Sequence, residues 1–547
     1  MLCLHLTSSR THSDGLCCCL YYSTFAEFTH GHSSDQYELW NALNLPSQRP
    51  PPKTQWSSFL ESILSGSFLL MTAKDDLSLR VPAEIWLELT SHLSFNTLCN
   101  LSLTCKSIKN LVQPLLFRHV YFSPTFDENK SSSAFIEEII NYLDFLSSPR
   151  FVASVQSCTI DPPTLTTPMT EEVLLVVLEG LRYFPNLRTL HLRKVTLTLN
   201  VITALRKLDM SMLNLQSSIE SCMEQSVFEN RLPLLEFVFD RNIPFSSNQL
   251  STSALALFLN PTTLKMFFGA QFRAENILVA LASSPRPFMS LKTVHFGVDV
   301  MSQEGLIPAL AQCPTIEKVC LHQQPWDLTV CDAPEETLPS DILPNLRVYE
   351  GSHTFATFFC KYHSLKRVAL KPSHSRSPKF TDPETICASL GNLGPLVESL
   401  DIPGGTLMTE HILSTISTSF PLMKSMSLNA YPFYSEPFSR ITQVRHALST
   451  AVLPIGLESI SLGVKVEDDF PKQEVLDHVQ LCWQACPGLQ IVRIRYGRYP
   501  LSKSIVWRRS TMLAEYQKTG VMQPSIAQLR VEPICMAGTP TPCSDNL

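Results

Sequence analysis

The sequence is poor in glycine and in charged residues. Glycine accounts for 18 of the 547 residues and charged side chains for 17%, whereas soluble domains contain about 7% glycine and about 25% charged residues. Proteins that bind cofactors or phosphates through glycine-rich loops are therefore disfavoured, as are flexible glycine linkers. Proline, by contrast, is abundant at 39 residues, which indicates that it regularly marks the ends of structural elements.

An excess of basic residues and long apolar runs are also missing. Lys and Arg number 43 against 49 Asp and Glu, a net charge of -6, so we expect no nucleic-acid partner. The apolar stretches 68–71 and 173–178 fall far short of the roughly 18 residues that span a bilayer. The first residues lack the basic start and apolar run of a secretory signal. We therefore expect no membrane partner and a cytoplasmic and/or nuclear location.

The 17 cysteines show no repeated pair spacing of the kind that a structural zinc site needs. Adjacent Cys17, Cys18 and Cys19 cannot easily converge on one ion, and Cys482 and Cys486 form a single pair at helical spacing. Buried thiols in a reducing compartment are the better interpretation. We expect no metal site.

Motifs that carry catalysis are absent as well. There is no phosphate loop, zinc-protease helix, calcium loop or Gly-x-Ser-x-Gly elbow. His295, His322 and His363 lie beside expected strands and are predicted to be surface or half-buried side chains rather than ligands or bases. We expect no catalytic residues and no cofactor.

An orderly apolar pattern follows an irregular stretch of 74 residues. Pro82 suits the first turn of a helix, and Ile85, Leu89 and Leu93 then recur on one helix face. Asn96 is suited to cap a second helix. The second and third helices carry Leu98, Leu101, Cys105, Ile108, Leu111, Leu115 and Leu116. Three short helices bury little surface among themselves, so this unit needs a partner or a neighbouring domain.

These helices resemble an F-box motif, particularly those of fungal F-box proteins. The resemblance is carried by residues 81–85, the apolar positions above, residues 104–106 and residues 116–118, and it departs from the motif at Val81, where leucine is usual. It implies binding to the Skp adaptor of cullin-based SCF ubiquitin ligases. The adaptor-binding residues, in or directly behind the interface, would be Pro82, Ile85, Leu89, Leu93, Leu98, Leu101 and Cys105. The alternative is that they form only the core of a small helical cap.

A second pattern recurs along the rest of the chain: apolar, two residues, apolar, one residue, apolar. The clearest copies follow a proline by two places and are Pro185 with Leu187, Leu190 and Leu192; Pro314 with Ile316, Val319 and Leu321; Pro395 with Val397, Leu400 and Ile402; Pro421 with Met423, Met426 and Leu428; and Pro487 with Leu489, Val492 and Ile494. Copies without that proline begin at Val155, Leu291, Leu365 and Leu457, and weaker ones at Leu235, Leu264 and Leu346. The last two apolar positions alternate as in a strand with one buried face.

Stretches with helical spacing lie between the copies, at 171–181, 274–281, 411–416 and 475–483. One strand with one helix cannot bury its own apolar face, so stacking of copies supplies the core. The proline would end the outer helix and start the turn back to the strand. The pattern resembles the leucine-rich repeats that follow the F-box in one large class of F-box proteins. The alternative is a generic α/β domain.

The sequence therefore predicts an α/β fold in which a short three-helix F-box-like module precedes a curved leucine-rich-repeat solenoid, with parallel strands inside and helices outside. The predicted parts are a poorly ordered leader at 1–74, the helical module at 75–122, the solenoid at 123–500 and a tail or cap at 501–547.

One arginine-rich patch lies at the end of the repeats. Arg493 and Arg495 alternate with Ile494 in the expected last strand, and Arg498 follows. Arginine and the interleaved aromatic residues dominate interface energetics, so this is a candidate partner-binding surface. The alternative is the polar cap that every solenoid end needs.

The predicted function is that of a substrate-recognition subunit of an SCF-type cullin ubiquitin ligase. Its F-box would dock the Skp adaptor, and through it the cullin, while the repeats bind a target protein that the sequence does not identify. The chain itself would not be an enzyme. The alternatives are a non-catalytic leucine-rich-repeat scaffold without a role in ubiquitin transfer and an α/β enzyme, which would need convergent polar groups in a pocket.

Overall fold

The structure is a computed structural model. It describes residues 3–4, 20–21, 90, 93, 95–103, 106–122, 132–161, 169–219, 231–239, 252–269, 274–302, 304–322, 337–360, 365–371, 395–402, 410–428, 441–463, 472–496 and 503–533. The chain falls into two compact units, Met1–Glu220 with Ala537–Leu547 and Ser221–Met536. The predicted leader, except for two short strands, lies outside the described residues. The predicted domain boundaries stay a prediction.

The first unit combines two short helices with the start of a parallel sheet. Its elements in order are β1 (Cys3–Leu4), β2 (Leu20–Tyr21), α4 (Phe95–Ser102), α5 (Lys106–Leu116), β3 (His119–Phe122), α6 (Ser132–Ser147), β4 (Ser157–Ile160), α7 (Glu171–Leu181), β5 (Thr189–Leu197), α8 (Leu199–Leu205) and β6 (Met212–Ile219). Strands β3 to β6 lie side by side in chain order and are parallel. The pair β1 and β2 is antiparallel.

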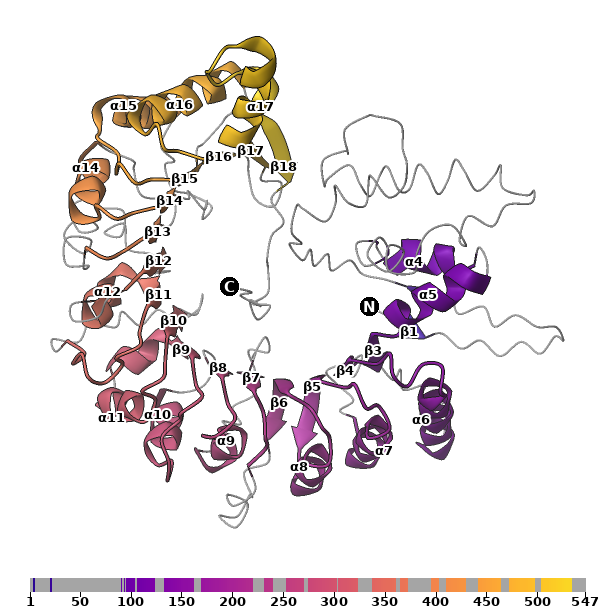
Figure 1. The fold of residues 1–547 in the computed structure, drawn as a ribbon. Coiled ribbons are helices and arrows are strands. Elements are labelled where there is room, and N and C mark those ends of the chain that lie inside the picture. Colours follow the sequence, from indigo (N-terminus) through magenta and orange to yellow (C-terminus); the bar gives the residue numbers. More distant parts are fainter. Residues whose placement is uncertain are drawn as a thin grey trace, which may run out of the picture. The chain divides into compact units, whose positions relative to one another are not determined.

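The second unit continues the alternation of strand and helix. Its elements are β7 (Glu236–Phe239), α9 (Thr252–Phe258), β8 (Met266–Phe268), α10 (Ala274–Ala282), β9 (Thr293–Gly297), η3 (Val298–Ser302), α11 (Leu306–Ala311), β10 (Lys318–His322), β11 (Val348–Ser352), α12 (His353–Cys360), β12 (Arg367–Lys371), β13 (Ser399–Ile402), α14 (Glu410–Ser419), β14 (Ser425–Leu428), α15 (Ile441–Thr450), β15 (Ser459–Gly463), α16 (Lys472–Ala485), β16 (Ile491–Tyr496), β17 (Lys503–Arg508), α17 (Arg509–Thr519), η5 (Ile526–Gln528) and β18 (Arg530–Pro533). Strands β7 to β16 are parallel, and β17 and β18 join antiparallel. Within this unit the strands line the inner side, and helices α9 to α12 and α14 to α16 line the outer side (Figure 1).

One backbone pattern sets the register of the sheet. The carbonyl of Lys292, just before β9, accepts hydrogen bonds from the N–H groups of Glu317 (2.8 Å) and Lys318 (2.9 Å) at the start of β10. The carbonyl of Lys366 bonds the N–H groups of Glu398 and Ser399 in the same way, at 2.8 and 3.0 Å. Because the pair recurs from strand to strand, the apolar positions of successive copies stack directly on one another.

The predicted apolar triplets form the core of this mixed α/β fold. In the copy at β10, Ile316, Val319 and Leu321 are at most 1% exposed. The predicted helices are confirmed: 171–181 is α7, and the other three lie within three residues of α10, α14 and α16. A long parallel sheet, with helices between most of its successive described strands, is consistent with the predicted solenoid.

The prolines were predicted to end the outer helix and start the turn to the strand, and the structure gives their position in that turn. Pro185, Pro314 and Pro421 occupy the second position of a four-residue turn, in which the first apolar residue of the triplet donates its N–H to the carbonyl three residues before. These bonds run from Leu187 to Phe184, from Ile316 to Cys313 and from Met423 to Phe420, at 3.2 to 3.3 Å. Proline favours this position because its ring presets φ.

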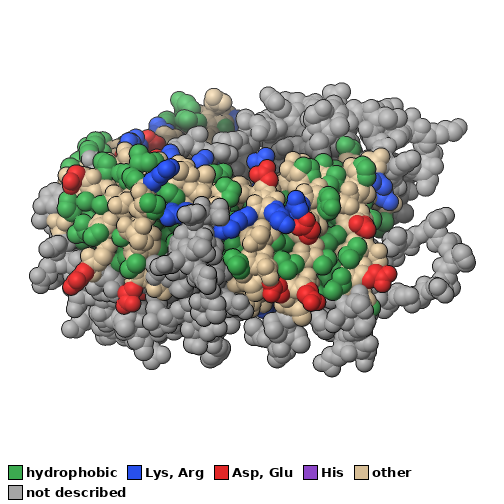
Figure 2. All heavy atoms as spheres, turned by 90° about the horizontal axis from the view of Figure 1, so that it is seen from below, with side chains coloured by type: hydrophobic (Ala, Val, Ile, Leu, Met, Phe, Trp, Pro, Cys, Tyr) green, Lys and Arg blue, Asp and Glu red, His purple; other side chains and the backbone are tan. Residues whose placement is uncertain are grey.

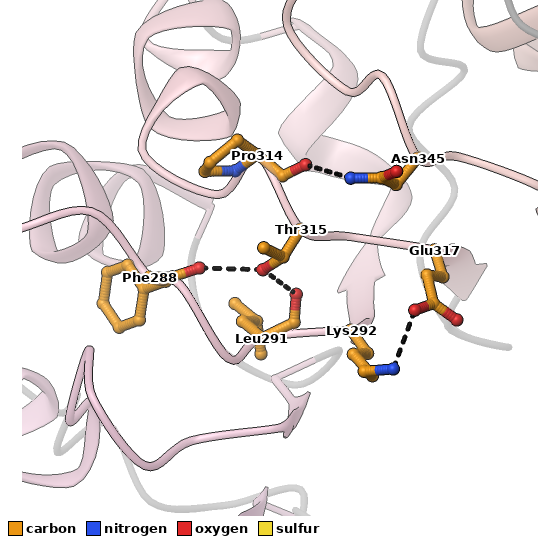
Figure 3. A network of polar contacts seen from close by, with 7 residues as sticks. All are labelled: Phe288, Leu291, Lys292, Pro314, Thr315, Glu317 and Asn345. Atoms are coloured by element: carbon orange, nitrogen blue, oxygen red, sulfur yellow. Dashed lines mark hydrogen bonds and ion pairs between the residues drawn. The ribbon is translucent and has the colours of Figure 1, made fainter.

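Polar side chains tie one turn to the next (Figure 3). Asn345 Nδ2 donates to the carbonyl of Pro314 at 3.2 Å. Thr315 Oγ1 lies 3.0 Å from the carbonyl of Phe288 and 2.9 Å from that of Leu291. These bonds satisfy carbonyl groups that the turn leaves outside the sheet, which lets the turns stack without buried unpaired acceptors.

Two expectations about single positions need correction, and two copies of the pattern were missed. The weak copy expected to begin at Leu235 begins at Leu234, which is fully buried, because Phe237 and not Val238 pairs with Phe267 in register. Asn96 lies inside α4, which begins at Phe95, rather than capping it. Two copies were not predicted, and they place Val120 and Phe122 in β3 and Leu213 and Leu215 in β6 as buried pairs.

The surface reflects the low charge of the sequence. Seen from below, hydrophobic and uncharged polar side chains cover most of the described surface, and charged side chains form small separate groups (Figure 2). No helix in the described part of the chain is long and apolar enough to cross a membrane.

Candidate functional site

The helical module is built around a small apolar core. Leu98 and Leu101 of α4 are 7% and 3% exposed and pack with Ile108 and Val112 of α5. The partly buried side chains of Leu93, Leu115 and Leu116 pack against this cluster. Leu98 and Leu101 are therefore core residues of the module, which support its surface from inside and are not themselves exposed on it.

Four of the seven residues predicted to bind an adaptor, Pro82, Ile85, Leu89 and Cys105, lie outside the described residues. The structure brings the other three, Leu93, Leu98 and Leu101, into one cluster. It also shows an apolar side chain that the sequence pattern did not single out: Leu103, in the turn after α4, is 84% exposed. A large apolar side chain on the surface of a small binding module is a candidate contact residue.

An aromatic cluster joins α5 to the first strand–helix step of the same unit. The ring centroid of Phe117, directly after α5, lies 4.5 Å from that of Phe151. The ring centroid of Phe145 in α6 lies 4.9 Å from that of Phe151. Arg150 Nη2 donates to Asn110 Oδ1 at 3.1 Å. These contacts pack the end of α5 directly against α6 and the turn that follows it.

The predicted arginine patch is placed differently from the expectation. Arg493 and Arg495 lie in β16 and alternate with the buried Val492 and Ile494, as predicted, but both are half-buried and β16 is not the last strand. Strand β17 pairs with β16 on its other side, Arg493 opposite Val506. Arg498 lies outside the described residues. The patch stays a prediction of a binding surface, now one on a strand inside the sheet.

The elements beyond β16 contain a buried tryptophan. Trp507 of β17 is fully buried, and its Nε1 donates to Oε1 of the buried Gln528 at 2.9 Å. Trp507 is therefore a core residue of the cap and offers nothing to a partner. Within the segment predicted as a tail or cap, residues 503–533 form β17, α17, η5 and β18.

The histidines and cysteines discussed next pack against neighbouring side chains in the described part of the chain. His295 Nδ1 lies 2.9 Å from His322 Nε2, and both half-buried rings pack on Phe268, as predicted for half-buried side chains. Burial raises the pKa of Cys313 and of Cys482 to about 12, so both thiols stay protonated at neutral pH and are poor nucleophiles. Among the described residues no group of His, Cys, Asp or Glu could hold a metal ion. His363 lies outside them.

Comparison with known proteins identifies the helical module. No curated protein sequence matches this chain. Among solved structures, a chain in the crystal structure of the mouse RP105/MD-1 complex is similar at 15% identity and a TM-score of 0.33; the match covers 63% of this chain and 52% of that chain, about half of its length. A family model described as F-box-like matches residues 79–123, which contain α4 and α5. Residues 79–123 are an F-box-like domain.

Proposed function

We propose that this chain is the substrate-recognition subunit of an SCF-type cullin ubiquitin ligase, of the fungal kind that its F-box resembles. The observation that carries the proposal is the F-box-like domain at residues 79–123, since domains of this family typically bind Skp adaptors. The adaptor would connect the chain to a cullin, and the assembly would work in the cytoplasm and/or the nucleus.

The strand–helix repeats are the part proposed to hold the target protein, as a leucine-rich-repeat solenoid. Parallel strands present one row of side chains per strand on the face opposite the helices, which gives a long surface made of many short segments. Such a surface suits recognition of another polypeptide.

The proposed contribution to ubiquitin transfer is proximity. An adaptor held by the F-box and a target held by the repeats would be brought into one assembly, which replaces a bimolecular encounter by a local one. This requires a stiff connection, and the cluster of Phe117, Phe145 and Phe151 supplies one between α5 and the first repeat step. No catalytic group of this chain is needed.

The test is affinity purification of the tagged full-length chain from its native cell, followed by mass spectrometry. We expect the Skp adaptor and a cullin to be recovered together with candidate targets that accumulate when the chain is deleted. Recovery of stable partners with neither adaptor nor cullin would contradict the proposal and favour the scaffold without a role in ubiquitin transfer.

A further inference from the structure

The turns that lead into strands β13 to β16 form one edge of the second unit. These four strands pair in register, so the residues at the same place before each strand stack from turn to turn. The two residues directly before each apolar triplet are exposed, and they are Pro395 with Leu396, Pro421 with Leu422, Ile455 with Gly456, and Pro487 with Gly488. All of them are proline, aliphatic or glycine residues. We call these residues the turn edge.

The apolar side chains of the turn edge are large and accessible. Leu396, Leu422 and Ile455 are 45%, 53% and 92% exposed, and Val452, three residues before Ile455, is 72% exposed. Single exposed apolar residues are common on protein surfaces and need no explanation. A row of them on adjacent turns is different, because a contiguous apolar strip is typical of an interaction site.

Other turns of the chain carry a polar side chain where the turn edge has leucine. Asn186, Thr315 and Asn345 each precede a triplet directly and donate a hydrogen bond to a carbonyl of the preceding turn, at 2.7 to 3.2 Å (Figure 3). Leu396 and Leu422 cannot form this bond, so the stacking of turns does not require a leucine there. The leucines instead expose apolar surface, a cost that contact with a partner would offset.

A row of charged side chains borders the turn edge. Glu398, Lys424 and Glu458 each follow the first residue of a triplet. Glu398 Oε2 lies 2.8 Å from Lys424 Nζ, and Glu398 Oε1 lies 3.6 Å from Lys366 Nζ. The Lys366, Glu398 and Lys424 side chains are 54%, 34% and 55% exposed. An apolar strip beside exposed ion pairs has the layout of a protein interface, with an apolar centre and a polar rim.

The spacing of the turns selects the conformation of the partner. Successive turns follow one another at the separation of neighbouring strands, about 4.8 Å. A helix presents one side-chain position per turn at about 5.4 Å, so across four turns it departs from the edge by only about 2 Å. An extended chain presents a side chain on one face every 6.6 to 6.8 Å or so, and departs by about 6 Å. A helix therefore matches the turn edge, and an extended segment does not.

We propose that the turn edge docks an amphipathic helix of a partner protein. The apolar face of that helix would lie along Leu396, Leu422 and Ile455, and its flanking charges would meet the row that includes Lys424 and Glu458. The turn edge is not the strand face proposed to hold the target, so it would be a second binding surface. The proposal does not rest on the proposed function, because such docking needs neither the adaptor nor ubiquitin transfer.

The test is photo-crosslinking of the full-length chain in its native cell. The photoreactive residue p-benzoylphenylalanine replaces Leu422 in one variant and Ile455 in another; both side chains are exposed, so the fold is kept. We expect both variants to crosslink to the same segment of one partner protein, in which apolar residues recur at steps of three and four. The matched control carries the photoreactive residue at Val279, which is 53% exposed on α10, and should not crosslink to that segment.

A titration of the full-length chain with a synthetic peptide of the crosslinked segment, followed by fluorescence anisotropy, measures the affinity. The double variant Leu422→Ser with Ile455→Ser should bind the peptide about tenfold more weakly or worse, whereas Val279→Ser should bind it normally.

Four outcomes would overturn the proposal. They are crosslinking no stronger than from position 279, crosslinks to a second copy of this chain, a crosslinked segment with apolar residues at alternate positions, and equal peptide affinity of the double variant and the unmodified chain. Adaptor capture should be normal in the double variant. Failure here is therefore distinguishable from failure of the proposed function, which adaptor capture tests.

Discussion

Replacing Leu93 by aspartate is expected to abolish capture of the chain by a purified Skp adaptor. Leu93 packs against the core formed by Leu98, Leu101, Ile108 and Val112. A carboxylate in this apolar setting has no partner, and burying it against the adaptor costs several kcal/mol, enough to remove measurable binding. The measurement is a pull-down with immobilised adaptor at matched protein concentration.

A second substitution separates binding from folding, because Leu93→Asp also disturbs the small core of the module. Leu103 is 84% exposed, so an aspartate there meets water in the free chain and leaves the fold intact. We expect Leu103→Asp to weaken adaptor capture about tenfold, as an unpaired charge at a binding surface does. Ile455, which is 92% exposed in the other compact unit, gives a control variant, Ile455→Asp, that should bind normally. Full adaptor capture by both Leu93→Asp and Leu103→Asp would contradict this placement of the interface.

The repeated elements could be predicted from sequence because each copy obeys the same physical rule. An apolar triplet spaced as in Leu489, Val492 and Ile494 buries all three residues wherever a strand has one covered face, and these three are at most 1% exposed. The helices were predictable for the same reason. Their positions follow from a period of 3.6 residues, which depends on local spacing alone.

The copy at β11 shows where local spacing fails. Leu346 and Tyr349 fit the triplet, but the third position is Gly351, which weakened the prediction. The Tyr349 ring is fully buried, and its Oη donates to the carbonyl of Ser352 at 2.7 Å. A Cβ at Gly351 would lie 2.6 Å from that Oη and 3.0 Å from Leu321 Cβ. Glycine is therefore present because the tyrosine fills the space of two apolar side chains, a fact of packing between strands.

The F-box-like module and the contacts of Asp161 differ in how much the sequence reveals about them. The F-box-like module lies within one continuous stretch, so its resemblance and its helical spacing were both visible. Tyr121, Asp161 and Arg193, by contrast, come together from β3, from the residue after β4 and from β5, and Lys194 lies at a register shift in β5. Neither strand order nor an irregular register follows from the spacing of residues in one sequence.

Replacing Trp507 by alanine is expected to destabilise the second unit by about 3–5 kcal/mol. The indole is fully buried in β17, directly opposite Val492 of β16, and therefore covers the last parallel strand. Its Nε1 is bonded to Gln528 Oε1, and Gln528 Nε2 in turn lies 2.5 Å from Glu515 Oε2 of α17. Loss of the ring leaves a large cavity and removes the donor that holds η5 against β17. The measurement is unfolding in urea, in which the urea concentrations at half unfolding are compared between variants whose unfolding free energy depends equally steeply on urea.

Two further variants apportion this effect between packing and hydrogen bonding. Trp507→Phe keeps most of the apolar volume but loses the N–H, and because Gln528 Oε1 still accepts from the Ser525 N–H at 3.2 Å, we expect a loss of only about 1–2 kcal/mol. Leu513→Ala on α17, where the side chain is 39% exposed, should cost less than about 1 kcal/mol. If Trp507→Ala lowered the unfolding free energy no more than Leu513→Ala does, the cap would add little to the stability of the sheet. A large loss of unfolding free energy confined to Trp507→Ala would instead mean that residues 503–533 stabilise the parallel sheet by covering its last strand. An uncovered apolar strand edge would in addition favour aggregation.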